Sequence, residues 1–374
     1  MFRDYNFKKY DFFLILVVVA LVSIGIIAIG SATQINTTGL SKFRNKQLYG
    51  FILFFIMMIA LSIINYHFIG KFYWFIYVFN IILLLAVRFV GVENHNAVRW
   101  IVIAGIKFQP SELSKIMMVI FFAKYIDKNK EKINNLIFLL KTSVLVIIPT
   151  FLIYKQPDLS TSLVILVIFV VLLFVAGISY KYVAIALLIT VPLIFASIWY
   201  IQQPNQTIFS PHQVKRVKNF FHPELSSKSD TWQTDHSIQA IGSGQLYGKG
   251  RYKGTINKYN YLPEPQTDFI YSIIGEEGGF IACSIVLALL LLLIIKCLWI
   301  AKDSVDLYGM LIISGYVAII LFQTFVNVGV ATGLIPNTGI PLPFISYGLS
   351  SLLTNMIGIG IILNIGLHRK TINY

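Results

Sequence analysis

Repeated apolar runs constrain this chain more than any other feature of its sequence. A run of about 18 or more mostly apolar residues can cross the hydrocarbon core of a bilayer as a helix. Such runs lie at about residues 11–31, 47–64, 70–90, 109–126, 134–154, 161–176, 179–200, 268–296, 307–332 and 343–367. The mean hydropathy of +0.76 agrees with this pattern. We therefore predict an all-α polytopic membrane protein with about ten transmembrane helices, forming one domain over residues 1–374.

The distribution of basic residues predicts the orientation of these helices. With both termini in the cytoplasm, the inner loops and tails carry 13 Lys and Arg, against 7 in the short outer loops. The positive-inside rule favours this arrangement. The inner set also suits anionic lipid head groups, so the net charge of +14 requires no nucleic-acid partner. Residues 201–267 then form a long external loop between helices 7 and 8, rich in glycine and carrying eight basic and four acidic residues.

Ionisable residues lie within or beside the apolar runs, where burial makes them costly. Glu112 and Lys115 stand in QPSELSK, and Asp158 stands in QPDLST. Charged groups at membrane depth usually pair with one another or serve function. Glu112 and Lys115 share a helix face, so they can form a structural ion pair; alternatively, Lys115 holds a substrate group or positions Asp158. Asp158 either complements a helix N-terminus or contributes to binding.

Asp268 ends the long loop and begins the eighth predicted helix, at the membrane surface. It is the best candidate for a general base, a group that takes a proton from an attacking hydroxyl. The alternative is that it only complements the helix dipole beside a capping Thr267. Glu276 and Glu277 follow about 12 Å further along the helix, and we expect them to pair with a buried cation.

Several outer residues suit an anionic ligand. Arg99 and Arg216 carry guanidinium groups, which can bind phosphate through two hydrogen bonds. Lys249 lies in the sequence GKG, where glycine lets the backbone approach a ligand closely. Prolines and glycines between 333 and 348 break helicity, and this segment forms either a polar groove or an external re-entrant turn. Ser346 and Tyr347 within it are secondary candidates for substrate binding.

Seven stretches of sequence together resemble a known family. They are NAVRWI (96–101), FQPSELSK (108–115), QPDLST (156–161), AIGSGQLYGKGRYKGT (240–255), LPEPQTDFIYSIIGEEGG (262–279), FVNVGVATGLIPNTGIPLPFISYG (325–348) and SS (350–351). In this order and spacing they resemble the shape, elongation, division and sporulation (SEDS) family over nearly the whole chain. The GSGxLxGKGxxxGT pattern favours the RodA branch over the FtsW branch. Leu349 and His236 depart from the family pattern, which has Gly and Gln there.

The resemblance implies a peptidoglycan glycosyltransferase that polymerises lipid II at the outer face of the bacterial cytoplasmic membrane during cell elongation. Asp268 aligns with the essential aspartate of the family. The implied partners are lipid II, glycan linked to undecaprenyl diphosphate, and a class B penicillin-binding protein that acts as transpeptidase. Cationic groups or a divalent cation, Mg or Mn, would stabilise the departing diphosphate. Two other functions stay open: a lipid II transporter, since buried charges and broken helices suit transporters, and a non-catalytic scaffold of the cell-wall synthase complex.

Overall fold

The computed structural model describes most of the chain. The described residues are 10–33, 42–94, 97–103, 105–203, 206, 207, 209, 211–221, 228–259 and 261–368. Five basic residues used above to predict orientation lie outside them, namely Arg3, Lys8, Lys9, Arg369 and Lys370, and so does Glu224 of the long loop.

Long helices occupy each of the ten predicted ranges. They are α1 (Phe12–Ala32), α2 (Lys42–Ile63), α4 (Tyr73–Val90), α5 (Pro110–Lys128), α6 (Leu136–Lys155), α7 (Leu159–Val175), α8 (Tyr180–Gln202), α12 (Ile270–Lys302), α13 (Leu307–Ala331) and α14 (Leu349–Leu367). Within the described residues, eight of them are long and apolar enough to cross a membrane. The exceptions are α5, which carries several charges, and α7, which has 17 residues. The all-α polytopic class is confirmed, and the count of ten spans stays a prediction.

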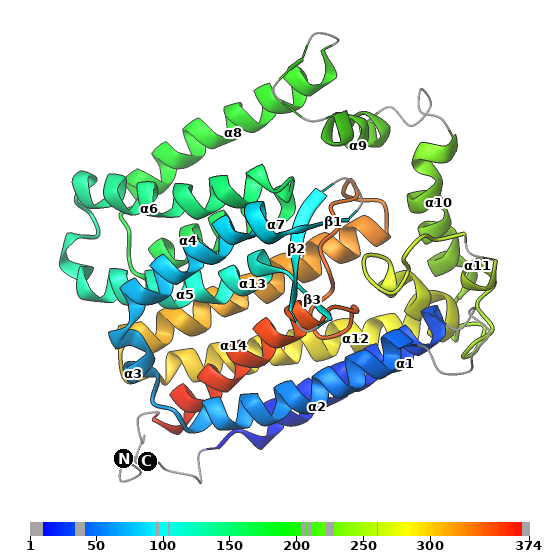
Figure 1. Cartoon of the computed structure of the whole chain (residues 1–374), viewed down its shortest axis with the longest axis horizontal. Coiled ribbons are helices and arrows are strands. Elements are labelled where there is room, and N and C mark those ends of the chain that lie inside the picture. The colour runs from blue at the N-terminus through cyan, green and yellow to red at the C-terminus, as the bar shows by residue number, and fades with distance from the viewer. Residues whose placement is uncertain are drawn as a thin grey trace.

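Short elements fill the connections between the long helices. A six-residue helix, α3 (Tyr66–Lys71), precedes α4 where a single span from residue 70 was predicted. The long segment before α12 contains α9 (Pro211–Phe221), α10 (Lys228–Ser243) and α11 (Thr255–Lys258), and a 3-10 turn, η2 (Lys130–Lys132), follows α5. Figure 1 shows α3 at one end of the helical bundle and α10 and α11 at the other.

A small antiparallel sheet lies between α4 and α5, where the sequence predicted only a loop. Its strands, in the order β1-β2-β3, are Val92–Asn94, Ala97–Ile103 and Ile106–Phe108. Val92 pairs with Trp100, and Ile101 pairs with Phe108. The sheet directly precedes the first turn of α5 and carries Arg99 on its central strand.

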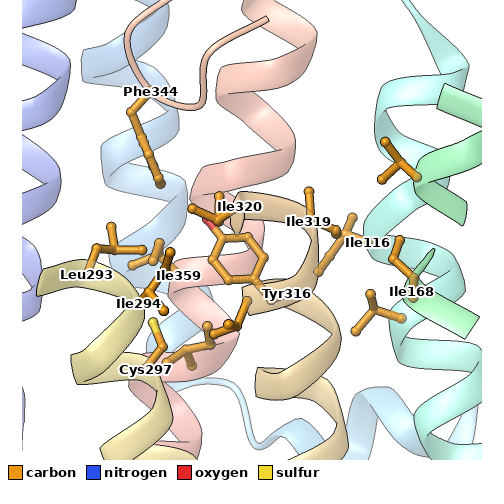
Figure 2. Packing of buried hydrophobic residues seen from close by; sticks show 14 of the residues in the cluster. Ile116, Ile168, Leu293, Ile294, Cys297, Tyr316, Ile319, Ile320, Phe344 and Ile359 are labelled. Atoms are coloured by element: carbon orange, nitrogen blue, oxygen red, sulfur yellow. The ribbon is translucent and has the colours of Figure 1, made fainter. Parts of the chain in front are cut away.

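The core of the bundle surrounds α13 and α14. Figure 2 shows Tyr316 of α13 between apolar side chains of α12 and α14, with Ile116 of α5 and Ile168 of α7 on the far side of α13. Small residues permit this packing, as they do between helices in membranes. A Cβ on Gly358 of α14 would lie 2.3 Å from the Tyr316 ring, so a larger side chain there would separate α13 from α14.

Leu349 and His236, which depart from the family pattern, have defined neighbours, whereas the helix α8 is largely exposed. Leu349, which replaces the expected glycine, packs against α2: a Cβ added at Gly50 would lie 2.4 Å from its Cδ2. His236 stacks on Tyr261, and its Nδ1 donates a hydrogen bond of 3.0 Å to Gln239 Oε1. The helix α8 extends away from the rest of the bundle in Figure 1, and most of its apolar side chains are exposed. An exposed apolar surface of this kind suits contact with lipid.

Candidate active site

Asp268 lies in the segment just before α12 and not within it. The helix begins at Ile270 with Phe269 as its N-cap, so the predicted start at residue 268 is wrong by two residues. Phe269 makes no capping hydrogen bond through its side chain. The backbone carbonyl of Asp268 accepts a hydrogen bond of 3.0 Å from Asn327 Nδ2 of α13. This contact fixes the backbone at Asp268 and leaves its carboxyl group for other partners.

The surroundings of Asp268 change its acidity. Burial raises the pKa of Asp268 to about 6, while the positive charges of Arg216 and Arg99 act in the opposite direction and Glu264 adds to the increase. The residue as a whole keeps some exposure to solvent, so its carboxyl group is shielded from water without being fully enclosed. A carboxyl group with this pKa is mostly ionised at neutral pH, yet it holds a proton more firmly than an ordinary aspartate. Both properties suit a general base.

Arg99 brings the small sheet against the start of α7. Its Nε donates to the carbonyl of Gln156 at 3.1 Å, and its terminal nitrogen donates to the carbonyl of Pro157. Asp158 follows directly and caps α7 by accepting from the backbone N–H of Thr161 at 3.1 Å. Because its other oxygen accepts from Gln109 at 3.0 Å and from Ser111 at 3.2 Å, Asp158 holds the starts of α5 and α7 together.

The Gly- and Pro-rich segment between α13 and α14 lies beside Asp268 and contacts α7. Thr338 accepts a hydrogen bond from Ser160 Oγ of α7 through its carbonyl oxygen. At Gly339, a Cβ would lie 3.6 Å from Asp268 Oδ2, and the φ of +73° there also suits glycine. Asp268 therefore faces a segment that is tied to α7, beside the Arg99 charge.

Ser346 and Tyr347 attach this segment to the residues before α12. Ser346 Oγ donates to the carbonyl of Thr267 at 2.7 Å and accepts from the N–H of Leu342 at 2.8 Å. The N–H of Tyr347 donates to the carbonyl of Gln266 at 2.8 Å, and its ring contacts Phe43 edge to face. The Ser346 side chain and the Tyr347 backbone therefore support the residues just before Asp268, whereas the Tyr347 ring packs on α2.

Glu112 and Lys115 form the ion pair that their spacing predicts. Lys115 Nζ lies 2.8 Å from Glu112 Oε2, and the two residues are 1% and 4% exposed. Asp158 has its hydrogen bonds with Gln109, Ser111 and Thr161, so the prediction that Lys115 positions Asp158 receives no support from these contacts.

Lys249 points toward α12 and pairs with Glu276 at 2.7 Å. This pairing confirms the expected cation for Glu276, although Lys249 is only partly buried, whereas Glu277 accepts a hydrogen bond from Ser31. Glu276 stands eight residues beyond Asp268, which corresponds to about 12 Å at the helical rise of about 1.5 Å per residue. The Lys249 ammonium is therefore held at Glu276 and not at Asp268. The geometry sets Lys249 apart from Arg99 and Arg216, with which it was grouped as a ligand for phosphate.

Asn327 and Gln109 are the site residues that the sequence reasoning did not single out. Asn327 Nδ2 donates to the carbonyl oxygens of Asp268 and Ile340, at 3.0 and 2.8 Å. It therefore ties α13 both to the segment before α12 and to the segment before α14. An asparagine inside an apolar run was a usable signal, because an amide at membrane depth needs hydrogen-bonding partners. Gln109 belongs to the FQPSELSK motif, but it was passed over because the search was for charged groups.

The carboxylates of the site do not form a metal-binding cluster of their own. Among the residues that the structure describes, no three His, Cys, Asp or Glu side chains gather closely enough to hold a metal ion. Mg²⁺, however, is often bound by one or two carboxylates together with phosphate oxygens of a substrate. A divalent cation at Asp268 would fit only in that shared form.

Comparisons with known proteins identify the relatives of this chain. The model of the FtsW, RodA and SpoVE family of cell cycle proteins matches residues 12–371. The peptidoglycan glycosyltransferase MrdB of Escherichia coli K12 is 35% identical over 80% of this chain and 79% of its own length. A chain from a peptidoglycan synthase complex that coordinates polymerization and crosslinking is 27% identical, with a TM-score of 0.80 over 96% of this chain and 97% of that one. The rod shape determining protein RodA of Thermus thermophilus is 25% identical, with a TM-score of 0.69 over 98% of both chains.

Proposed function

The chain belongs to the FtsW, RodA and SpoVE family of cell cycle proteins, and we propose that it is a peptidoglycan glycosyltransferase whose general base is Asp268. The observation that carries the assignment of the base is the position of Asp268: partly buried before α12, with a pKa raised to about 6 and two guanidinium charges acting on it. Lipid II is the substrate, and the product is a glycan strand. The similarity to MrdB over most of both chains supports the reaction class.

The chemistry follows from the groups around Asp268. Lipid II is a glycosyl diphosphate, so its sugar is already activated for transfer. Asp268 accepts the proton of the attacking 4-hydroxyl as the new bond to the anomeric carbon forms. The bond between that carbon and the diphosphate oxygen breaks, and undecaprenyl diphosphate leaves. Arg99 and Arg216 stabilise the negative charge of the leaving group, since guanidinium groups bind phosphate strongly.

The backbone contacts of α12 favour an enzyme over a transporter. A broken helix is typical of transporters, in which the freed backbone groups coordinate the transported substrate or ion. Here α12 is broken at Gly279, where φ is +67° and ψ is −165°. The groups beside the break bond to the chain itself: Phe280 N donates to Gln245 O at 2.8 Å, and Ile281 N donates to Leu246 O at 3.2 Å. They are therefore not available to a passing ligand.

Location and partners form part of the same proposal. The chain is a multi-pass protein of the bacterial cytoplasmic membrane with both termini in the cytoplasm, so that the segment 201–267 and Asp268 face outward. The basic inner loops support this orientation. A class B penicillin-binding protein crosslinks the strands that this chain makes during cell elongation, and the similarity to a chain of a peptidoglycan synthase complex supports a partner of that kind.

We propose that a divalent cation, Mg or Mn, would be held by the Asp268 carboxylate together with phosphate oxygens of the substrate. Such a cation would supply charge neutralisation at the leaving group. The Asp268 carboxylate and the guanidinium groups of Arg99 and Arg216 lie in one environment without the cation. Excess chelator should lower polymer formation, and addition of Mg²⁺ or Mn²⁺ should restore it; full activity in chelator would remove the cation from the proposal.

The proposed activity is tested with purified protein and lipid II in detergent, where no membrane has to be crossed. The expected result is glycan polymer and released undecaprenyl diphosphate, with the class B penicillin-binding protein and a divalent cation present. Failure to form polymer under those conditions, by a protein that is folded and monodisperse, would contradict the proposal.

A further inference from the structure

The glycine-rich segment 244–256 is built into the break of α12. Beside the bonds at Phe280 and Ile281, Lys249 N donates to Glu276 O and Gly250 N donates to Glu277 O, both at 3.0 Å. The segment thus takes up backbone groups on both sides of Gly279. Broken helices in membranes require such replacement partners, because no water is available there to supply them.

Glycines make this close insertion possible. A Cβ on Gly244 would lie 1.9 Å from the carbonyl oxygen of Gly275, and one on Gly248 would lie 2.2 Å from that of Glu277. On the α12 side, a Cβ on Gly279 would lie 2.4 Å from Gly248 N. Backbone therefore packs directly on backbone here, and these glycines are explained without a ligand.

Two adjacent acids fasten the segment. Glu276 is fully buried, and its Oε1 accepts from Lys249 Nζ at 2.7 Å, from Thr255 N at 2.7 Å and from Ile256 N at 3.0 Å. Glu277 accepts from Ser31 Oγ near the end of α1. The segment is therefore held to α12 and, through α12, to α1.

The fastened part of α12 is the part that leads to Asp268. Residues 270–278 form a short helical piece between the break at Gly279 and the segment that carries Asp268. Its other end is held by Asn327 and by Ser272, whose Oγ lies 2.6 Å from Ser237 Oγ. The position of this piece, and with it that of Asp268, is thus set jointly by these contacts and by those made at Glu276.

We propose that Glu276 and Lys249 form a latch that positions Asp268 by holding residues 270–278 against the segment 244–256. In this proposal, which rests on the proposed function, Lys249 is a positioning residue and does not bind the diphosphate. A displacement of about 1 Å at a reacting group can cost about 100-fold in rate, so a small movement of this piece is enough to affect catalysis.

The test compares Lys249→Met, Lys249→Arg and the double variant Lys249→Met with Glu276→Gln. Lys249→Met leaves the Glu276 charge buried without its cation. It should lower kcat by about 10- to 100-fold and leave KM for lipid II within about twofold. Lys249→Arg keeps the charge. The double variant leaves no charge unpaired, and the amide oxygen at position 276 can still accept from Thr255 N and Ile256 N and so keep the segment on α12. Both should therefore recover most of kcat. Lys253→Met, an exposed lysine in the same segment, is the matched control and should resemble wild type.

Hydrogen exchange supplies a readout that does not depend on activity. Lys249→Met should increase exchange at 245–250 and 270–281 and leave α14 unchanged. If KM rises while kcat is kept, and the double variant does not recover, Lys249 binds substrate and the latch is wrong. Unchanged exchange in Lys249→Met would also overturn it. If wild type makes no polymer, the proposed function fails, whereas the exchange result still decides whether the latch holds residues 270–278.

Discussion

At the scale of the residue, the proposed chemistry depends on the carboxylate of Asp268. Asp268→Asn keeps the shape of the side chain and removes its basicity, so polymerisation of lipid II should fall by about 10²- to 10⁴-fold, the usual loss for a general base. Expression and the melting temperature should stay near those of wild type. Asp235→Asn makes the same change at an exposed acid of α10, so it is the matched control and should retain activity. Activity of the Asp268→Asn variant within about threefold of wild type would remove Asp268 from the mechanism.

The raised pKa of Asp268 gives a second prediction at this scale. A base with a pKa of about 6 loses its active, ionised form as the pH falls, so the polymerisation rate should decline to half near pH 6. Arg216 lowers the pKa of Asp268 by its positive charge. Arg216→Gln should therefore raise that pKa and move the acidic limb of the pH profile to higher pH. Lys253→Met serves as a charge-matched control. A limb that stays in place, or moves to lower pH, would show that Arg216 does not act on the base.

At the scale of the element, α5 contains the buried ion pair of Glu112 and Lys115 near its N-terminal end. Lys115→Met alone leaves a buried carboxylate without its partner, which costs about 3–5 kcal/mol when such pairs are broken. Glu112→Gln together with Lys115→Met removes both charges and should be more stable than the single variant in thermal unfolding. If the pair is only structural, the double variant should also polymerise lipid II. A folded but inactive double variant would instead assign Lys115 to the substrate.

The helices were predictable from sequence because length and apolar composition alone decide which segments suit a bilayer. The sheet at 92–108 was not, because its three strands are short and only the middle one has more than three residues. The break at Gly279 was also missed: the glycines at 275, 278 and 279 were a local signal, but the backbone partners of the residues beside the break lie some thirty residues earlier in the chain. The ion pair at Glu112 was predictable from local spacing, whereas the partner of Lys249 was not, since it is 27 residues away.

At Asp268, too, the local sequence predicted the candidate residue, whereas its environment depends on residues distant in the chain. Its motif singled it out, but its pKa depends on Arg216 and Arg99, which come from α9 and from the small sheet. Only the fold brings these three residues into one environment. The sequence indicated each of them as a candidate separately, and it gave no sign that Lys249 belongs to a different cluster.

At the scale of the whole molecule, an enzyme and a transporter differ in which membrane face can reach the site. A transporter that works by alternating access exposes its substrate site to each side in turn, whereas a polymerase needs only the outer face. Cys283 and Cys297 are buried and unpaired, so both can be replaced to give a background without reactive thiols. Single cysteines are then placed at positions 251 and 302, which are both exposed. Position 251 precedes α12 and position 302 ends it, so a single crossing by this candidate span would put them on opposite sides.

A membrane-impermeant thiol reagent should separate the two positions in sealed vesicles of known orientation. We expect Arg251→Cys to react only with reagent outside and Lys302→Cys only with reagent inside, because α12 crosses the bilayer once between them. A cysteine at 268 should follow position 251 if the site opens outward, as we propose. The protein with Asp268 intact, reconstituted with the proposed class B penicillin-binding protein and a divalent cation, should convert lipid II to polymer. Labelling of position 268 from both sides, together with absence of polymer, would reject the glycosyltransferase and favour a lipid II transporter.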